Sequence, residues 1–182
     1  MRIAILDWGS LIPCPGGLAV KGIWHPDGPV LSIEFSRRSA DGRLTLVIDA
    51  ERGSAVTTQY IETTSPDLDA AIANLRRREG TTERNIGVCS RNAAETRSEK
   101  YPAVLPTITR WLGSSGFDAV IWTDLESNFA LGQNREQFLS AAFEYLDRLA
   151  DVCKANARDY INRTPQQTQT ALRRFLLSKG WL

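Results

Sequence analysis

This chain of 182 residues contains little histidine and little cysteine, and its positive and negative charges nearly balance. His25 is the only histidine, and the three cysteines are spread far apart, at Cys14, Cys89 and Cys153. A catalytic zinc ion normally takes several His or Cys ligands, and an odd, dispersed set of cysteines provides no disulfide framework. We therefore expect reduced thiols and no bound metal ion.

A formal net charge of +1 gives no general attraction for nucleic acid or for an anionic membrane, because both favour a strongly basic surface. Long apolar runs are also missing, so no segment has the length of a membrane span. Residues 1–7 enter a strand without the basic and then apolar pattern of a signal peptide. We expect a cytoplasmic protein with neither a nucleic-acid nor a membrane partner.

The clearest pattern in the chain is a helix over residues 65–80. Leu68, Ile72 and Leu75 recur at helical spacing. Glu79 lies on the same face, because eleven residues turn a helix to within about 20° of its starting direction. At the ends, Ser65 is the predicted N-cap, Pro66 suits the first helical position and Gly80 is the predicted stop.

Glu79 is the most informative side chain of this helix. It falls in the last turn, where partial burial and the negative end of the helix dipole both favour the protonated form and raise its pKa. A carboxyl group in such a place is suited to general acid–base catalysis. The alternative is an ordinary ion pair with the arginines at 76–78, which are expected near a helix C-terminus without any chemistry.

A second feature follows the predicted first strand, residues 1–7. The strand ends in the turn Trp8-Gly9-Ser10-Leu11, where Gly9 permits close backbone approach and Ser10 brings a hydroxyl and an N–H group. Trp8 could form the wall of a pocket. Gly-Ser turns are also common in loops that bind nothing, so the turn indicates a binding site only when it is considered together with Glu79.

Together these segments resemble motifs of the γ-glutamylcyclotransferase-like superfamily, which includes the ChaC-type glutathione-degrading enzymes. The turn is similar to the family's Tyr-Gly-Ser-Leu loop, and residues 75–80 are similar to the helix end Leu-x-x-Arg-Glu that carries the catalytic glutamate. The resemblance implies a substrate-binding role for the backbone amides of Trp8, Gly9, Ser10 and Leu11. It also implies that Glu79 moves protons while the substrate's α-amine attacks its γ-carbonyl and releases 5-oxoproline, without a cofactor.

The sequence departs from that family at two points. Trp8 stands where the family usually has tyrosine, and residues 81–86 lack the tyrosine that commonly follows the catalytic glutamate in ChaC-type enzymes. A γ-glutamyl or other amide-bearing small molecule different from glutathione is therefore a suitable partner. The alternative function is a noncatalytic module that binds a metabolite or a protein on the same scaffold.

Other candidate site residues come from outside these motifs. Arg37, Arg38 and Arg43 flank the turn of a hairpin predicted from residues 30–36 and 44–48. Any of them could hold a substrate carboxylate. Solvated turn charges are the alternative. Cys14 and His25 could also form a thiol nucleophile and its base, although neither lies in a known signature.

The remaining pattern completes an α+β prediction. Strands are expected at 55–63, 86–89 and 119–123, and helices at 104–112, after a cap at Asn134, at 155–162 and from a capping box at 164–167 to Gly180. The terminal Trp181-Leu182 could dock on the body or on a partner, so a homo-oligomer is a further expectation.

These patterns lead to one fold prediction. With 42% hydrophobic residues and no linker, repeat or low-complexity run, the chain suits a single domain over 1–182. We predict an α+β fold with a small mixed, partly closed sheet or barrel of the γ-glutamylcyclotransferase-like type. A helical C-terminal layer, at about 134–182, is expected to cover it.

Overall fold

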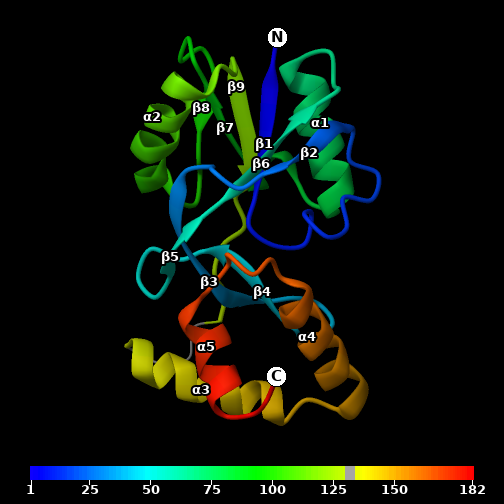
Figure 1. The fold of residues 1–182 in the computed structure, drawn as a ribbon, viewed down its shortest axis with the longest axis vertical. Helices are drawn as coiled ribbons and strands as arrows, with labels where there is room; N and C mark the ends of the chain where they lie inside the picture. The colour runs from blue at the N-terminus through cyan, green and yellow to red at the C-terminus, as the bar shows by residue number, and fades with distance from the viewer. Residues whose placement is uncertain (130–133) are drawn as a thin grey trace. The chain divides into compact units, whose positions relative to one another are not determined.

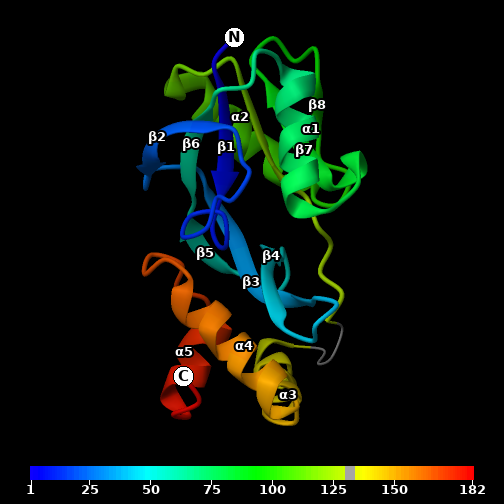
Figure 2. The ribbon, with the colours of Figure 1, turned by 90° about the vertical axis from the view of Figure 1, so that its right-hand side faces the viewer.

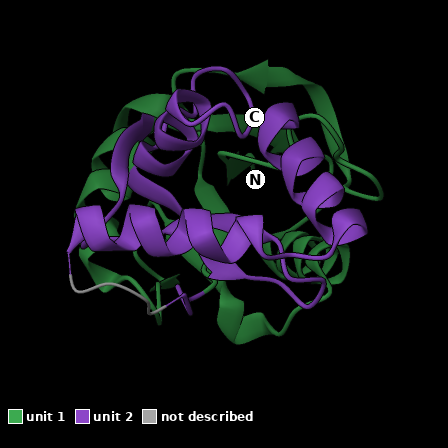
Figure 3. Cartoon of the chain, turned by 90° about the horizontal axis from the view of Figure 1, so that it is seen from below, with its two compact units in different colours: residues 1–31, 57–125 green, residues 32–56, 126–182 purple. Residues whose placement is uncertain are grey.

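The computed structural model describes residues 1–129 and 134–182. The chain folds into two compact units, each built from two separate segments (Figure 3). Unit 1 contains residues 1–31 and 57–125, and unit 2 contains residues 32–56 and 126–182. The helices that the sequence predicted as a C-terminal layer thus join the hairpin of residues 32–56 in unit 2.

Unit 1 is organised around a mixed sheet of six strands (Figure 1). Its central strand, β1, runs parallel to β9 and antiparallel to β6, so that Ile5 lies opposite both Ile121 and Ile61. In spatial order the strands are β2 (Val20–His25), β6 (Gln59–Thr63), β1 (Ile3–Asp7), β9 (Ala119–Thr123), β7 (Ile86–Ser90) and β8 (Thr96–Arg97). The predicted strands at the start of the chain, near 86 and at 119–123 are confirmed.

Helices α1 (Leu68–Glu79) and α2 (Leu105–Ser115) lie on opposite faces of this sheet (Figures 1 and 2). Two short 3₁₀ turns, Glu83–Asn85 and Pro102–Val104, precede β7 and α2. Side chains of a strand alternate between the two faces of its sheet, so Ile3 and Ile5 of β1 lie on the same face. On that face they pack in one buried cluster with Ile72 and Leu75 of α1. This packing fixes the face of α1 that carries Glu79.

The two ends of α1 differ in how well the sequence predicted them. Gly80 ends the helix in the left-handed conformation, with φ +60°, as expected. The predicted N-cap at Ser65 is wrong, because the Asp67 side chain accepts the N–H of Ala70 at 2.8 Å. Ser65 is instead held by Thr63, whose hydroxyl contacts the Ser65 hydroxyl and accepts the Ser65 N–H, each at 3.1 Å. Pro66 therefore precedes the helix.

The strand predicted at 55–63 is two strands that belong to different sheets. β5 (Ser54–Thr57) joins β3 and β4, whereas β6 joins the large sheet. They separate at the buried Thr58, whose N–H and hydroxyl both donate to the carbonyl oxygen of Pro29, at 3.2 and 2.8 Å. A threonine within a run of strand-forming residues favours a continuous strand, so the sequence does not predict this bond to a distant carbonyl group or the break that it causes.

Unit 2 combines a small antiparallel hairpin with three helices. The hairpin is β3 (Val30–Arg38) and β4 (Leu44–Ile48), as predicted, with β5 on the other side of β3. The helices are α3 (Arg135–Asp147), α4 (Asp151–Arg163) and α5 (Ala171–Ser178). Asn134 caps α3 by accepting the Gln137 N–H at 2.9 Å, which confirms that prediction.

The start of α5 was predicted incorrectly. Thr164 ends α4, and the N-cap of α5 is Thr170, whose hydroxyl accepts the Arg173 N–H. The buried carboxylate of Glu34 on β3 also accepts the N–H groups of Ala171 and Leu172, at 3.0 and 3.3 Å. An acid from a distant strand thus fixes where this helix begins, since it satisfies the first N–H groups of the helix.

The chain end packs within unit 2. Trp181 is buried, and the Arg158 guanidinium lies 4.9 Å from the centre of its ring. Of the two docking places that the sequence left open for this residue, the body of the protein is the one observed.

The structure confirms an α+β protein with a mixed sheet. Its described residues form two open sheets and no closed barrel. Within the same residues, none of the helices combines the length and apolar character needed to cross a membrane.

Candidate functional site

The turn that follows β1 is built around the carboxylate of Asp7. This residue is only 5% exposed, and its Oδ2 atom accepts the N–H groups of Gly9, Leu11 and Ile12 at 3.0, 2.9 and 3.3 Å. Successive N–H groups that converge in a tight turn form a small anion-binding concavity. Here the bound anion is the protein's own side chain.

Burial raises the pKa of the Asp7 carboxyl to about 7. The negative charge of Glu79 contributes to this rise, whereas the N–H groups of Gly9, Trp8 and Leu11 act in the opposite direction. A carboxyl group with such a pKa exchanges its proton near neutral pH. Glu79, at the end of α1, is the other acidic side chain that influences this carboxyl group.

Glu79 is the second acid of this site, and it is half-buried. Its side chain is only 15% exposed, because it continues the face of α1 that packs on the sheet. Burial raises its pKa, and the nearby charge of Arg78 partly opposes that shift. The sequence predicted the direction of this shift, with burial as one of its two causes.

The ion pair that the sequence left as an alternative is also present. Arg78 Nη1 lies 3.4 Å from Glu79 Oε1, which is longer than a good charge-assisted hydrogen bond. The same guanidinium makes shorter bonds elsewhere, since its Nη2 donates to the Cys14 carbonyl oxygen at 2.7 Å and its Nε to that of Pro15 at 2.9 Å. Arg78 therefore connects the loop after β1 to the end of α1.

Gly16 is required where this loop passes Arg78. Its φ of +60° is a conformation that other residues seldom adopt, and a Cβ atom there would lie 3.0 Å from Arg78 Nε. The small residue thus permits the arginine to reach the carbonyl groups of Cys14 and Pro15.

The predicted residues of the turn differ in accessibility. Trp8, Gly9 and Leu11 are buried, whereas Ser10 is half-buried. In the described part of the chain, neither the N–H nor the hydroxyl of Ser10 has a recorded hydrogen-bond partner, and only its carbonyl oxygen is used, by Cys14 N at 3.2 Å. These residues and Glu79 all belong to unit 1.

Arg37 and Arg38 belong to unit 2, and their contacts lie within it. Arg37 Nη1 donates to the Glu126 carbonyl oxygen at 2.7 Å. The Arg38 N–H donates to Asn128 Oδ1 at 2.6 Å, and its guanidinium lies 6.0 Å from the ring centre of Tyr145. These contacts account for both residues structurally, and a role in binding substrate stays a prediction.

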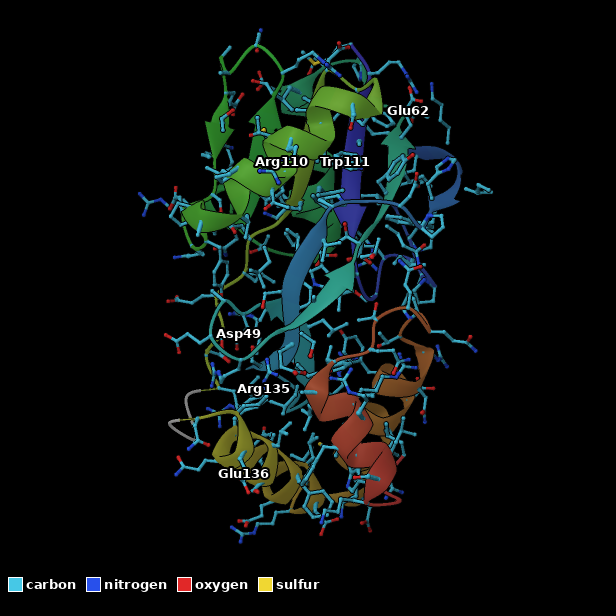
Figure 4. The ribbon with its side chains drawn as sticks, turned by 60° about the vertical axis from the view of Figure 1, so that its left-hand side comes forward. Asp49, Glu62, Arg110, Trp111, Arg135 and Glu136 are labelled. Atoms are coloured by element: carbon cyan, nitrogen blue, oxygen red, sulfur yellow. The ribbon has the colours of Figure 1, made fainter. Side chains whose placement is uncertain are left out.

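The proposed pairing of Cys14 with His25 finds no contact in the structure. Cys14 is exposed, and the His25 ring stacks on Tyr60 with 5.0 Å between ring centres. Tyr60 in turn meets the edge of Trp111 on α2, which Figure 4 labels. Within residues 1–129 and 134–182, no recorded interaction joins the thiol to the imidazole.

Asp7 is the site residue that sequence reasoning missed, because it was assigned only as the end of a strand. A usable signal was present, since an Asp followed at once by a Gly-Ser turn often accepts N–H groups from that turn. The described residues contain no group of three or more His, Cys, Asp or Glu side chains arranged to hold a metal ion. The chemistry that these residues can perform is proton exchange, by the buried carboxyl group of Asp7 and the half-buried one of Glu79.

Comparisons with protein-family models, with curated proteins and with solved structures found no match to this chain, so its site is interpreted from its own residues and geometry.

Proposed function

We propose that this protein is a γ-glutamylcyclotransferase-like enzyme, of that family's fold type, which cleaves a γ-glutamyl or related amide with Glu79 as general acid and base. The observation that carries the proposal is the Glu79 carboxyl group, 15% exposed in the last turn of α1, which Arg78 joins to the loop after β1. The likeness of residues 8–11 and 75–80 to that family's motifs supports the same assignment.

The reaction requires only proton transfers from the protein. The substrate's α-amine attacks its own γ-carbonyl carbon, a new C–N bond closes the five-membered ring, and the original amide C–N bond breaks. Glu79 accepts the proton that the attacking amine loses and returns it to the departing nitrogen. Its raised pKa suits both steps, because a carboxyl group with a pKa nearer neutral is a better base and is more readily protonated in turn.

Charge that develops on the carbonyl oxygen needs hydrogen-bond donors, and the turn of residues 8–11 is their proposed source. Trp8 replaces the family's usual tyrosine, so the amine part of the substrate, which leaves when the amide breaks, can differ from that of glutathione. We therefore favour γ-glutamyl amines and γ-glutamyl dipeptides over glutathione.

The experiment is a mass-spectrometric screen for 5-oxoproline. Wild-type protein and Glu79→Gln are incubated with γ-glutamyl amines, γ-glutamyl dipeptides and glutathione. Glu83→Gln is the matched control, because Glu83 is an exposed carboxylate in the same unit, with a side chain 68% accessible. Release of 5-oxoproline by wild type and Glu83→Gln, but not by folded Glu79→Gln, is the expected result.

Two results would contradict the proposal. Turnover that survives Glu79→Gln would remove Glu79 from the chemistry. Silence across the whole panel, with all three proteins folded, would favour the noncatalytic binding module instead.

A further inference from the structure

The turn after β1 has few donors left for a substrate. The N–H groups of Gly9, Leu11 and Ile12 donate to Asp7 Oδ2, and that of Trp8 also bonds to Asp7. An N–H group that already serves a buried carboxylate cannot donate to a carbonyl oxygen at full strength at the same time. The set of amides that the sequence assigned to substrate binding is thus largely occupied within the protein.

Ser10 is the exception inside this turn. It is the one half-buried residue between Trp8 and Leu11, which are themselves buried. Its N–H and its hydroxyl have no recorded partner among the described residues, and Cys14 uses only its carbonyl oxygen. Two donors of the one partly exposed residue between Trp8 and Leu11 are therefore left over from the hydrogen bonding of the turn.

We propose that Asp7 is a positioning residue of this site: its carboxylate folds the Trp8–Ile12 turn, and that turn presents the N–H and hydroxyl of Ser10 to the carbonyl oxygen of the substrate amide. The substrate part rests on the proposed function, whereas the folding of the turn by Asp7 does not. Asp7 itself touches no substrate, because it is enclosed by the turn that it holds.

The electrostatic surroundings make this arrangement measurable. The charged group that acts on Asp7 from another element is Glu79 of α1, and Arg78 stands beside Glu79. When Asp7 binds a proton, its carboxyl group becomes a weaker acceptor for the N–H groups of the turn. The amide protons of Gly9, Leu11 and Ile12 should therefore report the ionisation of Asp7.

The first test is an NMR pH titration of ¹⁵N-labelled protein, which needs no substrate. As the pH rises and Asp7 loses its proton, we expect the amide proton signals of Gly9, Leu11 and Ile12 to move downfield together, with a midpoint near pH 7. The amide signal of Ser10 should move least. In Glu79→Gln the same three signals should still titrate, with a lower midpoint, because a repelling charge has been removed. In Asp7→Asn the common titration should disappear.

Failure has a clear form in this experiment. If the three amides show no common titration anywhere between pH 3 and pH 9, or if Ser10 follows them fully, Asp7 does not hold the turn. Because wild type and Glu79→Gln already decide this, the result does not depend on whether Asp7→Asn folds.

The second test uses whichever substrate the 5-oxoproline screen identifies. Ser10→Ala removes one donor and should raise KM or lower kcat/KM by about tenfold, whereas the exposed Ser114→Ala on α2 should change neither. Asp7→Asn should lower kcat/KM as well, and the double variant Asp7→Asn/Ser10→Ala should lose less than the product of the single effects. Residues that act through each other give this coupling, and independent structural damage does not.

The two proposals fail separately. Absence of turnover with a normal amide titration would overturn the cyclotransferase and keep the Asp7 turn. Turnover with multiplicative losses in the double variant, or without any effect of Ser10→Ala, would overturn the role given to Ser10 and keep the enzyme.

Discussion

The Arg78 guanidinium donates to the Cys14 carbonyl oxygen at 2.7 Å, across 64 positions of sequence. Its Nε also donates to the Pro15 carbonyl oxygen, so a planar fork of two bonds joins the loop after β1 to the last turn of α1. The same residue lowers the pKa of Glu79. Arg78 therefore affects both the shape of the loop and the proton affinity of the candidate base.

These two effects can be separated by replacing Arg78 in two ways. Arg78→Lys keeps the charge but loses the fork, so we expect a looser loop, a higher KM and an unchanged acidic limb of the pH–rate profile. Arg78→Met loses the fork and the charge, so its acidic limb should move to higher pH, because the positive charge that lowers the pKa of Glu79 is then gone. Steady-state kinetics between pH 5 and pH 9 measure both quantities.

Arg77→Lys is the matched control, since Arg77 is an exposed neighbour on the same helix. It should leave KM and the pH profile as in wild type. If Arg78→Met left the acidic limb where it is, Arg78 would have no influence on the group that titrates.

Asp7 should make the stability of the protein fall as pH rises. Its pKa is about 7 in the folded protein against an ordinary 3.8, so the folded state binds more protons between pH 4 and pH 7. The free energy of unfolding then decreases with rising pH, by at most about 1.4 kcal/mol per pH unit from this one group. Asp7→Asn removes that contribution and should flatten the profile.

Urea unfolding at pH 5 and at pH 8 measures the effect as a difference between midpoints. A smaller slope should persist in Asp7→Asn, because the pKa of Glu79 is also raised and acts with the same sign. Asp69→Asn, an exposed change in the first turn of α1, should keep the wild-type slope. A wild-type midpoint that rises from pH 5 to pH 8 would contradict the raised pKa of Asp7.

Periodicity and turn chemistry predicted most of unit 1 from the sequence. The buried face of α1, its stop at Gly80 and the strand 119–123 are each fixed by local pattern. Strand β2 was not predicted, because it lies at the sheet edge, with mostly accessible residues and a pairing irregularity between Lys21 and His25. An edge strand of this kind has little of the hydrophobic alternation that identifies strands.

The candidate site was predictable only in part, for a related reason. Glu79 stands out because a carboxylate on an apolar helix face is unusual. Asp7 acquires its role from the way the next five residues fold around it, and Arg78 from a loop 64 positions away. Distant partners of this sort, like Glu34 at the start of α5, leave no local pattern in a single sequence.

The N-cap of α1 can be tested by comparing two residues. Asp67→Ala removes the side chain that accepts the Ala70 N–H, and we expect a loss of about 1 kcal/mol in the free energy of unfolding. Asp67→Asn should keep most of the stability, because asparagine caps almost as well. Pro66 and Ser65 precede the helix, so changing them leaves this cap in place. Equal stability of Asp67→Ala and wild type in urea would mean that a residue other than Asp67 caps this helix.

Gly87 on β7 provides a sharp test of the sheet register. It lies opposite Trp122 of β9, which is fully buried, and a Cβ atom at Gly87 would come within 2.1 Å of the Trp122 Cε2 atom. Neither side of this contact can move without disturbing the sheet. We therefore expect Gly87→Ala to lower the free energy of unfolding by about 1–3 kcal/mol or more, measured by urea unfolding.

The control is a glycine with space around it. A Cβ atom at Gly113 of α2 would meet nothing within 4 Å, so Gly113→Ala should stabilise the protein by up to about 1 kcal/mol through helix propensity. A smaller ring should also relieve the clash at Gly87. Trp122→Phe alone costs stability by leaving a void, but combined with Gly87→Ala it should cost less than the sum of the two single changes. Additive losses in the double variant would mean that the two side chains do not meet, and the register of β7 against β9 would then be wrong.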